Sequence, residues 1–179
     1  LEEKIEKIIS SDNKYNKITN LNFESGKAFR LEDAKGRYSE YLKSTLAKKI
    51  NLKKFKVVLD CGNGATYNVA PTLFWELGCD IITINDRPNG RNINKNCGAV
   101  DIRQLSKKVQ NVNADIGFAF DGDGDRLGVV DENGNEIFSD KIGLLISRNL
   151  SLEYKNSKFV VDVKSTGLFK TDKILKNNF

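Results

Sequence analysis

The sequence has no histidine and no methionine, only two prolines, and three cysteines among its 179 residues. Without histidine, Ser-His-Asp and Cys-His catalysis within the chain are excluded. A zinc site or a disulfide framework is also disfavoured, because Cys61, Cys79 and Cys97 form no CxxC pair and are odd in number. We therefore expect reduced, mostly buried thiols and a cytoplasmic protein.

Long apolar runs are missing as well. No stretch reaches the roughly 18 residues of a membrane span, and no signal-peptide pattern opens the chain, so we expect no membrane association. The net charge of +5 comes from lysines spread along the sequence, not from a compact basic block with interleaved aromatics. We expect no nucleic-acid function, although this charge is compatible with attraction to phosphate esters.

From residue 56 onward, short apolar runs alternate with segments of helical periodicity. Strands separated by single helices are typical of βαβ units and a mostly parallel sheet. We therefore predict an α/β fold with a mostly parallel or mixed sheet and three α/β/α layers. The predicted strands are 56–60, 80–84, 116–120, 127–130, 136–138 and 159–163, and the predicted helices are 1–11, 33–46, 68–77, 101–112, 140–150 and one after 167.

The chain has no initiator methionine and stops just after a predicted helix, so we expect a piece of a larger protein. Residues 151–179 offer one strand and one helix, which is too little to bury a core. We predict a central domain at 51–150, the end of a preceding domain with a polar linker at 1–50, and the start of another domain at 151–179. The long connection 85–100 has no apolar periodicity, and connections of this length are usually functional or disordered.

The most informative run is FAFDGDGDR at residues 118–126. A predicted strand leads into Asp121, Asp123 and Asp125, and the intervening glycines let the backbone curl so that these side chains converge. Carboxylates held this close repel by roughly 1 kcal/mol per pair in water, and without a cation the relief is protonation with raised pKa values. A hard divalent cation removes the repulsion, because Mg²⁺ and Ca²⁺ prefer carboxylate oxygen. We predict a metal site here rather than an acidic surface turn.

Two kinds of metal site can be compared with this run. In an EF-hand, Asp121, Asp123, Asp125 and Glu132 would be ligands 1, 3, 5 and 12, but position 6 is Arg126 instead of glycine and the preceding segment is a predicted strand. A carboxylate cluster at the carboxyl end of a strand in an α/β sheet fits better. The Arg126 guanidinium is suited to gripping a phosphate that also touches the metal. An ion pair with one of the aspartates is the other interpretation.

These residues resemble the α-D-phosphohexomutases. The run at 118–126 is similar to the metal-binding loop of that family, and LDCGNGA at 59–65 is similar to the first strand and loop of its second domain. PNGRNIN at 88–94, CGA at 97–99 and the stretch from Arg30 to Thr45 resemble the phosphoglucosamine mutase branch. DVKST at 162–166 looks more like the phosphomannomutase/phosphoglucomutase branch. The resemblance covers nearly the whole chain from about residue 26 onward.

The resemblance implies a four-domain enzyme, of which this chain carries the second domain with fragments of the first and third. Such enzymes pass a phosphoryl group from a phosphoserine to a hexose phosphate through a bisphosphate intermediate. It implies Mg²⁺ as the cofactor, held by Asp121, Asp123 and Asp125, with Arg126 near the transferring phosphate. Lys164 matches a lysine near the substrate in the second branch only, and a solvated lysine is the alternative.

No Ser-His-Asn-Pro phosphoserine loop, sugar-recognition loop or terminal phosphate-binding loop occurs in these residues. We therefore expect the chain to act on a hexose phosphate together with the remaining domains of the same enzyme. Glucosamine phosphate is the expected substrate, and mannose or glucose phosphate is the alternative. From another functional class, a non-catalytic Ca²⁺-binding module stays open. By itself the chain is expected to bind Mg²⁺ weakly and to have no mutase turnover.

Overall fold

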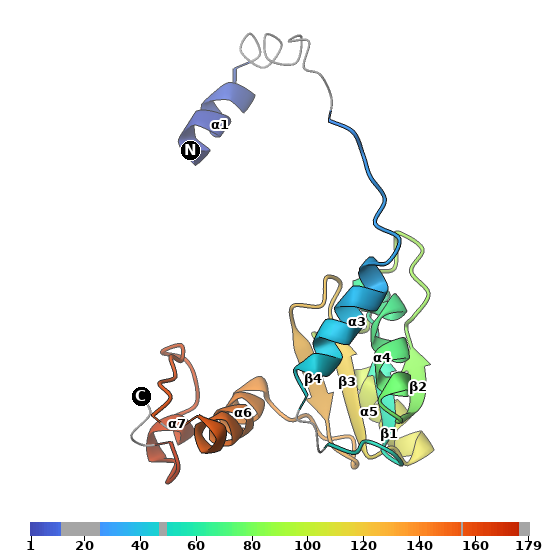
Figure 1. Cartoon of the computed structure of the whole chain (residues 1–179), viewed down its shortest axis with the longest axis vertical. Helices are drawn as coiled ribbons and strands as arrows, with labels where there is room; N and C mark the ends of the chain where they lie inside the picture. Colours follow the sequence, from blue (N-terminus) through green and yellow to red (C-terminus); the bar gives the residue numbers. More distant parts are fainter. Residues whose placement is uncertain (12–25, 47–49, 155, 176–179) are drawn as a thin grey trace. The chain divides into compact units, whose positions relative to one another are not determined.

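The computed structural model describes residues 1–11, 26–46, 50–154 and 156–175. The chain divides into two compact units, Leu1–Ala34 and Lys35–Phe179, each described here by itself (Figure 1). The first unit contains helix α1 (Glu2–Ile9), which confirms the helix predicted for residues 1–11. Glu2 and Glu3 in its first turn and Lys7 in its last turn complement the helix dipole. The polar linker predicted within residues 1–50 corresponds to the stretch 12–26, which lies almost wholly outside the described residues.

The second unit is built on a four-stranded mixed sheet in the order β2-β1-β3-β4. Its strands are β1 (Lys56–Asp60), β2 (Asp80–Ile84), β3 (Ile116–Phe120) and β4 (Leu127–Val130). β1 pairs in parallel with both β2 and β3, while β4 runs antiparallel to β3. The predicted α/β fold class and these four strand positions are confirmed. Because β1, β2 and β3 are parallel, their carboxyl ends meet at one edge of the sheet.

Helices cover both faces of this sheet and give the three predicted layers. Along β1, alternate side chains point to opposite faces, as a pleated strand requires. Val57 and Leu59 pack with Ala70 of α4 (Ala70–Glu76), which follows a short 3₁₀ turn, η1 (Ala65–Asn68). On the same face Phe74 of α4 meets Phe118 of β3, with ring centroids 5.6 Å apart. Helix α3 (Ala34–Ser44) lies beside α4 in Figure 1, and the side chains of Lys43 and Glu76 form an ion pair of 3.0 Å between them.

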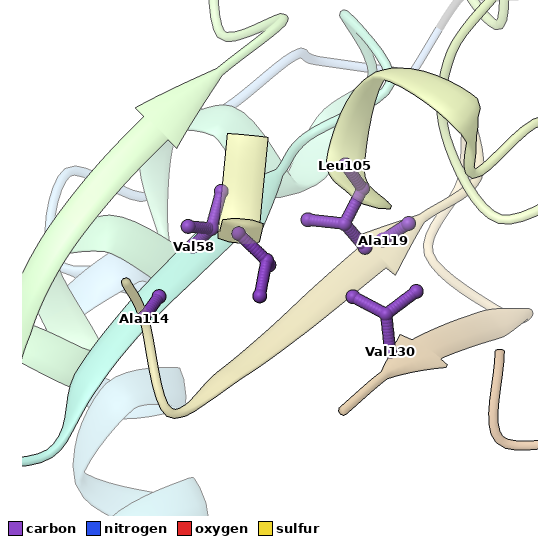
Figure 2. Packing of buried hydrophobic residues seen from close by; sticks show 6 residues of the cluster. Val58, Leu105, Ala114, Ala119 and Val130 are labelled. Carbon is purple, nitrogen blue, oxygen red and sulfur yellow. The ribbon is translucent and has the colours of Figure 1, made fainter. Parts of the chain in front are cut away.

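Helix α5 (Arg103–Val112) packs on the opposite face. Figure 2 shows Val58, Ala119 and Val130 directed from three strands toward Leu105 of this helix. All four side chains are fully buried. Gly117 of β3 lets the helix approach closely, because a Cβ atom there would lie 2.7 Å from the Cγ2 atoms of Val109 and Val130. Burial of this apolar surface contributes about 25 cal/mol per Å² removed from water.

The C-terminal part of the second unit forms a small cluster of its own. Helix α6 (Ser139–Glu153) contributes Leu144, which packs with Phe169 of the short helix α7 (Leu168–Thr171) and with Leu175. The side chains of Arg148 on α6 and Asp172 form an ion pair, and the Asp172 carboxylate is almost fully buried. These contacts hold residues 166–175 against α6.

Several predicted elements differ from the structure. The helix predicted at 68–77 begins as the 3₁₀ turn η1. Helix α5 begins at Arg103 with Ile102 as its N-cap residue; Asp101 lies one residue earlier, where its carboxylate accepts the backbone N–H of Arg103 at 3.4 Å and pairs with the Arg103 guanidinium. The strand at 136–138 is reduced to one bridge between Glu136 and Val130. Residues 159–163 form no strand, because no strand of the described part pairs with them; Val160 is 99% exposed. Within the described ranges, no helix combines the length and apolar character needed to cross a membrane.

Candidate metal centre

The acidic loop 121–126 is a tight connection between two antiparallel strands. Phe120 at the end of β3 pairs with Leu127 at the start of β4, so the chain reverses within six residues. The backbone N–H of Gly124 donates to the carbonyl of Asp121 at 3.2 Å, and Gly124 has a φ of +80°, a conformation that favours glycine. Strands on both sides of the loop exclude the helix–loop–helix of an EF-hand.

The loop brings the three predicted ligands together. One carboxylate oxygen from each of Asp121, Asp123 and Asp125 lies within 4.8 Å of the others. Asp121 is buried, with 1% of its surface exposed, while Asp123 and Asp125 face solvent. The cluster therefore has one fixed ligand at its base and two accessible ligands at its rim.

Arg126 fixes the buried ligand. Its backbone N–H donates to Oδ1 of Asp121 at 3.0 Å, and its Nε donates to Oδ2 at 2.8 Å. These contacts lower the pKa of Asp121 to about 2, with the backbone N–H as the largest cause. The ion pair that the sequence offered as one interpretation of Arg126 is therefore present. The Arg126 side chain is 61% exposed, so it can also reach a ligand in solution.

The pKa of Asp125 is displaced in the other direction. The pKa of Asp125 is raised, with the hydrogen bond to Asp121 as the largest cause and the negative charge of Asp123 as the next. The expected rise in pKa therefore holds for Asp125, where the hydrogen bond with Asp121 is a larger cause than repulsion between the carboxylates, and it is wrong for Asp121. The difference follows from Arg126, which supplies Asp121 with two donors and a positive charge.

The donor set suits a hard divalent cation. Three carboxylates offer only oxygen, which Mg²⁺ and Ca²⁺ prefer. Oxygens that lie within 4.8 Å of one another are close enough for one such ion to be held by all three side chains. The residues present thus fit the ion that the resemblance implies.

Backbone contacts from a neighbouring loop hold the acidic loop in place. The N–H of Ala65 donates to the carbonyl of Gly122 at 2.8 Å. Gly64 touches the same residue so closely that a Cβ atom on it would lie 2.4 Å from that carbonyl oxygen. On another side, the Ile93 side chain packs against Gly122. Sequence reasoning did not assign these supporting roles; the available signal was the glycine loop GNGA at 62–65, directly after a buried strand.

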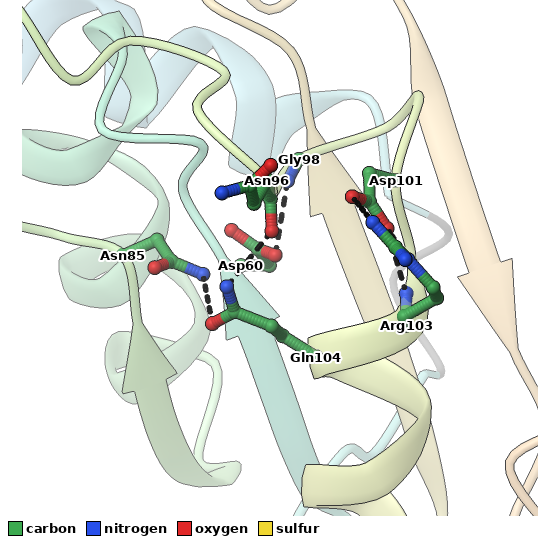
Figure 3. A network of polar contacts seen from close by, with 7 residues as sticks. All are labelled: Asp60, Asn85, Asn96, Gly98, Asp101, Arg103 and Gln104. Atoms are coloured by element: carbon green, nitrogen blue, oxygen red, sulfur yellow. Dashed lines mark hydrogen bonds and ion pairs between the residues drawn. The ribbon is translucent and has the colours of Figure 1, made fainter.

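Asp60 is a second buried carboxylate at this edge of the sheet. It ends β1, is 0% exposed, and accepts hydrogen bonds from the backbone N–H groups of Gly62 at 2.9 Å and Gly98 at 3.1 Å. Burial raises its pKa, and these two donors oppose the rise. Figure 3 shows Asp60 with Gly98, next to a chain of amide contacts in which Asn85 donates to Gln104 and Gln104 donates to the carbonyl of Asn96.

Two hollows border the acidic loop. One, of about 460 Å³, is lined mainly by apolar side chains of α3, α4 and β3 and reaches Asp123 and Gly124. The other, of about 380 Å³, lies between Arg126, Val100 and Ser139 at the start of α6. Lys164 lines neither hollow; it is exposed, and its backbone N–H donates to Asp162 at 2.7 Å. The structure thus brings together the three aspartates and Arg126, while Lys164 belongs to another segment.

Residues 36–134, more than half of the chain, match the family described as "Phosphoglucomutase/phosphomannomutase, alpha/beta/alpha domain II". The chain belongs to this family. A solved structure of a phosphoglucomutase/phosphomannomutase family protein from Burkholderia thailandensis is similar to it, with 30% identity and a TM-score of 0.64. That similarity covers 81% of this chain and 31% of the solved chain. The family resemblance and the three-layer fold are therefore both confirmed.

Curated relatives of this phosphohexomutase chain carry a narrower name. The phosphoglucosamine mutase of Vibrio vulnificus (strain YJ016) is 52% identical over 126 residues, which are 70% of this chain and 28% of the relative. The phosphoglucosamine mutase of Thermodesulfovibrio yellowstonii is 48% identical over 161 residues, which are 90% of this chain and 36% of the relative. The chain therefore spans about a third of the length of the curated relatives it matches.

Proposed function

We propose that this chain is the metal-binding domain of a phosphosugar mutase that interconverts glucosamine 6-phosphate and glucosamine 1-phosphate. The observation that carries the proposal is the convergence of three carboxylates beside Arg126 at the carboxyl edge of the sheet. The sugar follows from relatives about half identical to the chain that are named phosphoglucosamine mutase. The other domains of the same cytoplasmic enzyme supply the phosphoserine and the sugar contacts.

In this reaction a serine-bound phosphoryl group passes to a hydroxyl of the hexose phosphate, and the resulting bisphosphate returns its other phosphoryl group to the serine. Positioning and charge neutralisation supply most of the catalysis in such transfers. Mg²⁺, when bound, withdraws negative charge from the phosphoryl oxygens. Asp121, Asp123 and Asp125 hold that ion through carboxylate oxygen. The domain thus contributes the metal-binding half of a site whose nucleophile lies elsewhere.

Arg126 has a separate role in this proposal. Its Nε stays on Asp121, and its exposed terminal nitrogens donate to an oxygen of the transferring phosphate. Lys164 contacts the sugar phosphate only in the assembled enzyme, and a solvated lysine is the alternative. Because Arg126 is bonded to a metal ligand, it couples the position of the ion to the position of the phosphate.

The metal function is tested by calorimetry with Mg²⁺ and Ca²⁺ on the 179-residue chain. We expect weak Mg²⁺ binding, and we expect Asp123→Ala to weaken it by at least about tenfold, because one of three charged ligands is lost. Glu132→Ala is the matched control: it removes an exposed acid that lies outside the loop 121–126 and should leave the affinity unchanged. Tight Ca²⁺ binding without a Mg²⁺ response would favour the non-catalytic calcium module.

The catalytic function is tested by an activity assay with glucosamine 6-phosphate. The isolated chain should give no turnover, and turnover by this chain would contradict the division of roles proposed here. A second candidate substrate, mannose or glucose phosphate, is favoured by the DVKST run at 162–166. In the complete enzyme, the ratio of kcat/KM values for glucosamine, mannose and glucose phosphates decides between these substrates.

A further inference from the structure

The buried carboxylate of Asp60 joins two loops that contact the backbone on the two sides of Asp121. Its Oδ1 accepts the N–H of Gly62, and its Oδ2 accepts the N–H of Gly98, which lies 38 positions after Asp60 in the chain. In Figure 3 Asp60 lies at the end of β1, directed toward Gly98. Because the two N–H groups bind different oxygens, an amide in place of the carboxylate would put a donor opposite one of them.

The first branch runs from Gly62 to Gly122. Three residues beyond Gly62, the N–H of Ala65 donates to the carbonyl of Gly122, and Gly64 touches that residue. Gly122 lies between Asp121 and Asp123, so its position sets where those two carboxylates leave the backbone. A shift of the loop at 62–65 therefore moves two of the three ligands.

The second branch runs from Gly98 to Phe120. The N–H of Ala99, next to Gly98, donates to the carbonyl of Phe120 at 3.2 Å. The Cα atoms of Gly62 and Gly98 both crowd this same oxygen, since a Cβ atom on either would lie 2.7 Å from it. Phe120 and Gly122 flank Asp121, so the two branches hold the buried ligand from both sides.

We propose that Asp60 is a positioning residue for the metal centre, acting through Gly62–Ala65 and Gly98–Ala99 on the backbone around Asp121. The proposal rests on the proposed function in so far as the loop binds Mg²⁺. Asp60 itself does not touch the ion. It holds the segments 62–65 and 98–99 together. Loss of one acceptor oxygen leaves a buried N–H without a partner and releases one of these two segments. Outer partners that orient metal ligands commonly change metal affinity by 10- to 100-fold.

The test measures Mg²⁺ affinity of the 179-residue chain by calorimetry. Asp60→Asn is nearly isosteric and removes one acceptor, and we expect Mg²⁺ binding about tenfold weaker. Asp60→Glu keeps the charge but displaces the oxygens, and should weaken binding similarly; it also serves if Asp60→Asn does not fold by circular dichroism. Affinities within about twofold of wild type in the folded variants would overturn the proposal.

Two controls separate positioning from other effects. Asp101→Asn removes a nearby negative charge but leaves the hydrogen bonds of Asp60 to Gly62 and Gly98 in place. If Asp60 acts through these bonds and not through its charge, Asp101→Asn should change the Mg²⁺ affinity by twofold or less. Val109→Ala creates a cavity under α5 and lowers stability without touching Asp60, and it should also leave Mg²⁺ affinity unchanged. If either control weakens binding as much as Asp60→Asn does, the assignment fails.

A metal-free readout distinguishes this inference from the proposed function. We expect Asp60→Asn to accelerate amide hydrogen exchange at Ala65 and Ala99, the donors to Gly122 and Phe120, more than Val109→Ala does. If wild type binds no Mg²⁺ but this exchange pattern is observed, the metal function fails and the support by Asp60 stands. Exchange at Ala65 and Ala99 that matches Val109→Ala overturns the inference whatever the metal result.

Discussion

Gly64→Ala tests whether close backbone contact holds the metal loop. A Cβ atom at this position would lie 2.4 Å from the carbonyl oxygen of Gly122, 2.6 Å from its Cα and 2.8 Å from its carbonyl carbon. Gly64 has a φ of −111°, which alanine adopts freely, so the substitution introduces no backbone strain. Its effect is therefore steric overlap alone.

The overlap is large because the opposing atoms belong to the backbone. Ordinary contact begins at 3.4 Å, so the new methyl group enters about 1 Å too far and cannot be relieved by a rotamer change. Overpacking of this kind typically costs about 1–3 kcal/mol, and we expect the upper part of that range here. The displaced segment carries Asp121 and Asp123, so Mg²⁺ affinity should fall together with stability.

The assay combines urea unfolding with Mg²⁺ calorimetry. Gly36→Ala is the matched control: Gly36 lies in α3 with nothing within 4 Å of its virtual Cβ, and alanine there should stabilise the helix by up to about 1 kcal/mol. Gly64→Ala is expected to lower the free energy of unfolding and the Mg²⁺ affinity, while Gly36→Ala lowers neither. A Gly64→Ala chain within about 0.5 kcal/mol of wild type, with unchanged Mg²⁺ affinity, would refute the close-contact argument.

Three further predictions concern other parts of the chain. Leu105→Ala, at a fully buried position on α5, should lower the free energy of unfolding by about 2–5 kcal/mol in urea without changing the slope. Arg148 lowers the pKa of Asp172, so their pair stabilises the fold at neutral pH and this contribution is lost as the pH falls below about 4; the stability deficit of Arg148→Met should shrink over that range. Burial raises the pKa of Cys61 to about 12, so iodoacetamide at a pH of about 8 should modify it in the unfolded chain and not in the native one, as read by mass spectrometry.

The sequence was sufficient for elements whose signal is local. The runs that became β1 to β4 are short apolar stretches, each of which ends in or directly before an asparagine or aspartate, and their positions were predicted to the residue. The acidic triad could also be predicted, because three carboxylates within five residues leave few alternatives to a cation. Arg126 was offered as a phosphate ligand or as an ion-pair partner of an aspartate, and the structure contains the ion pair.

Features that depend on contacts between distant segments could not be predicted in this way. The run at 159–163 is as apolar as β1, yet it forms no strand, because a strand needs a paired neighbour and its sequence does not say whether one is near. The support of the metal loop is formed by backbone N–H groups and glycine Cα atoms from residues 62–65 and 98–99. Backbone donors are present at nearly every position, so residue types alone do not identify the ones that meet Gly122 or Phe120.

Asp60 and Asp121 illustrate how position decides the role of a carboxylate. Both lie at the carboxyl ends of neighbouring parallel strands, and both are almost completely buried. Burial dominates at Asp60 and raises its pKa, whereas the Arg126 backbone and guanidinium lower the pKa of Asp121. Both oxygens of Asp60 accept hydrogen bonds from two chain segments. Asp121 is kept ionised at the base of a cluster whose other members face solvent. An aspartate therefore holds two chain segments together at the end of β1, whereas an aspartate directly after β3 forms the buried member of a solvent-exposed carboxylate cluster. Only the second position is suited to binding a cation.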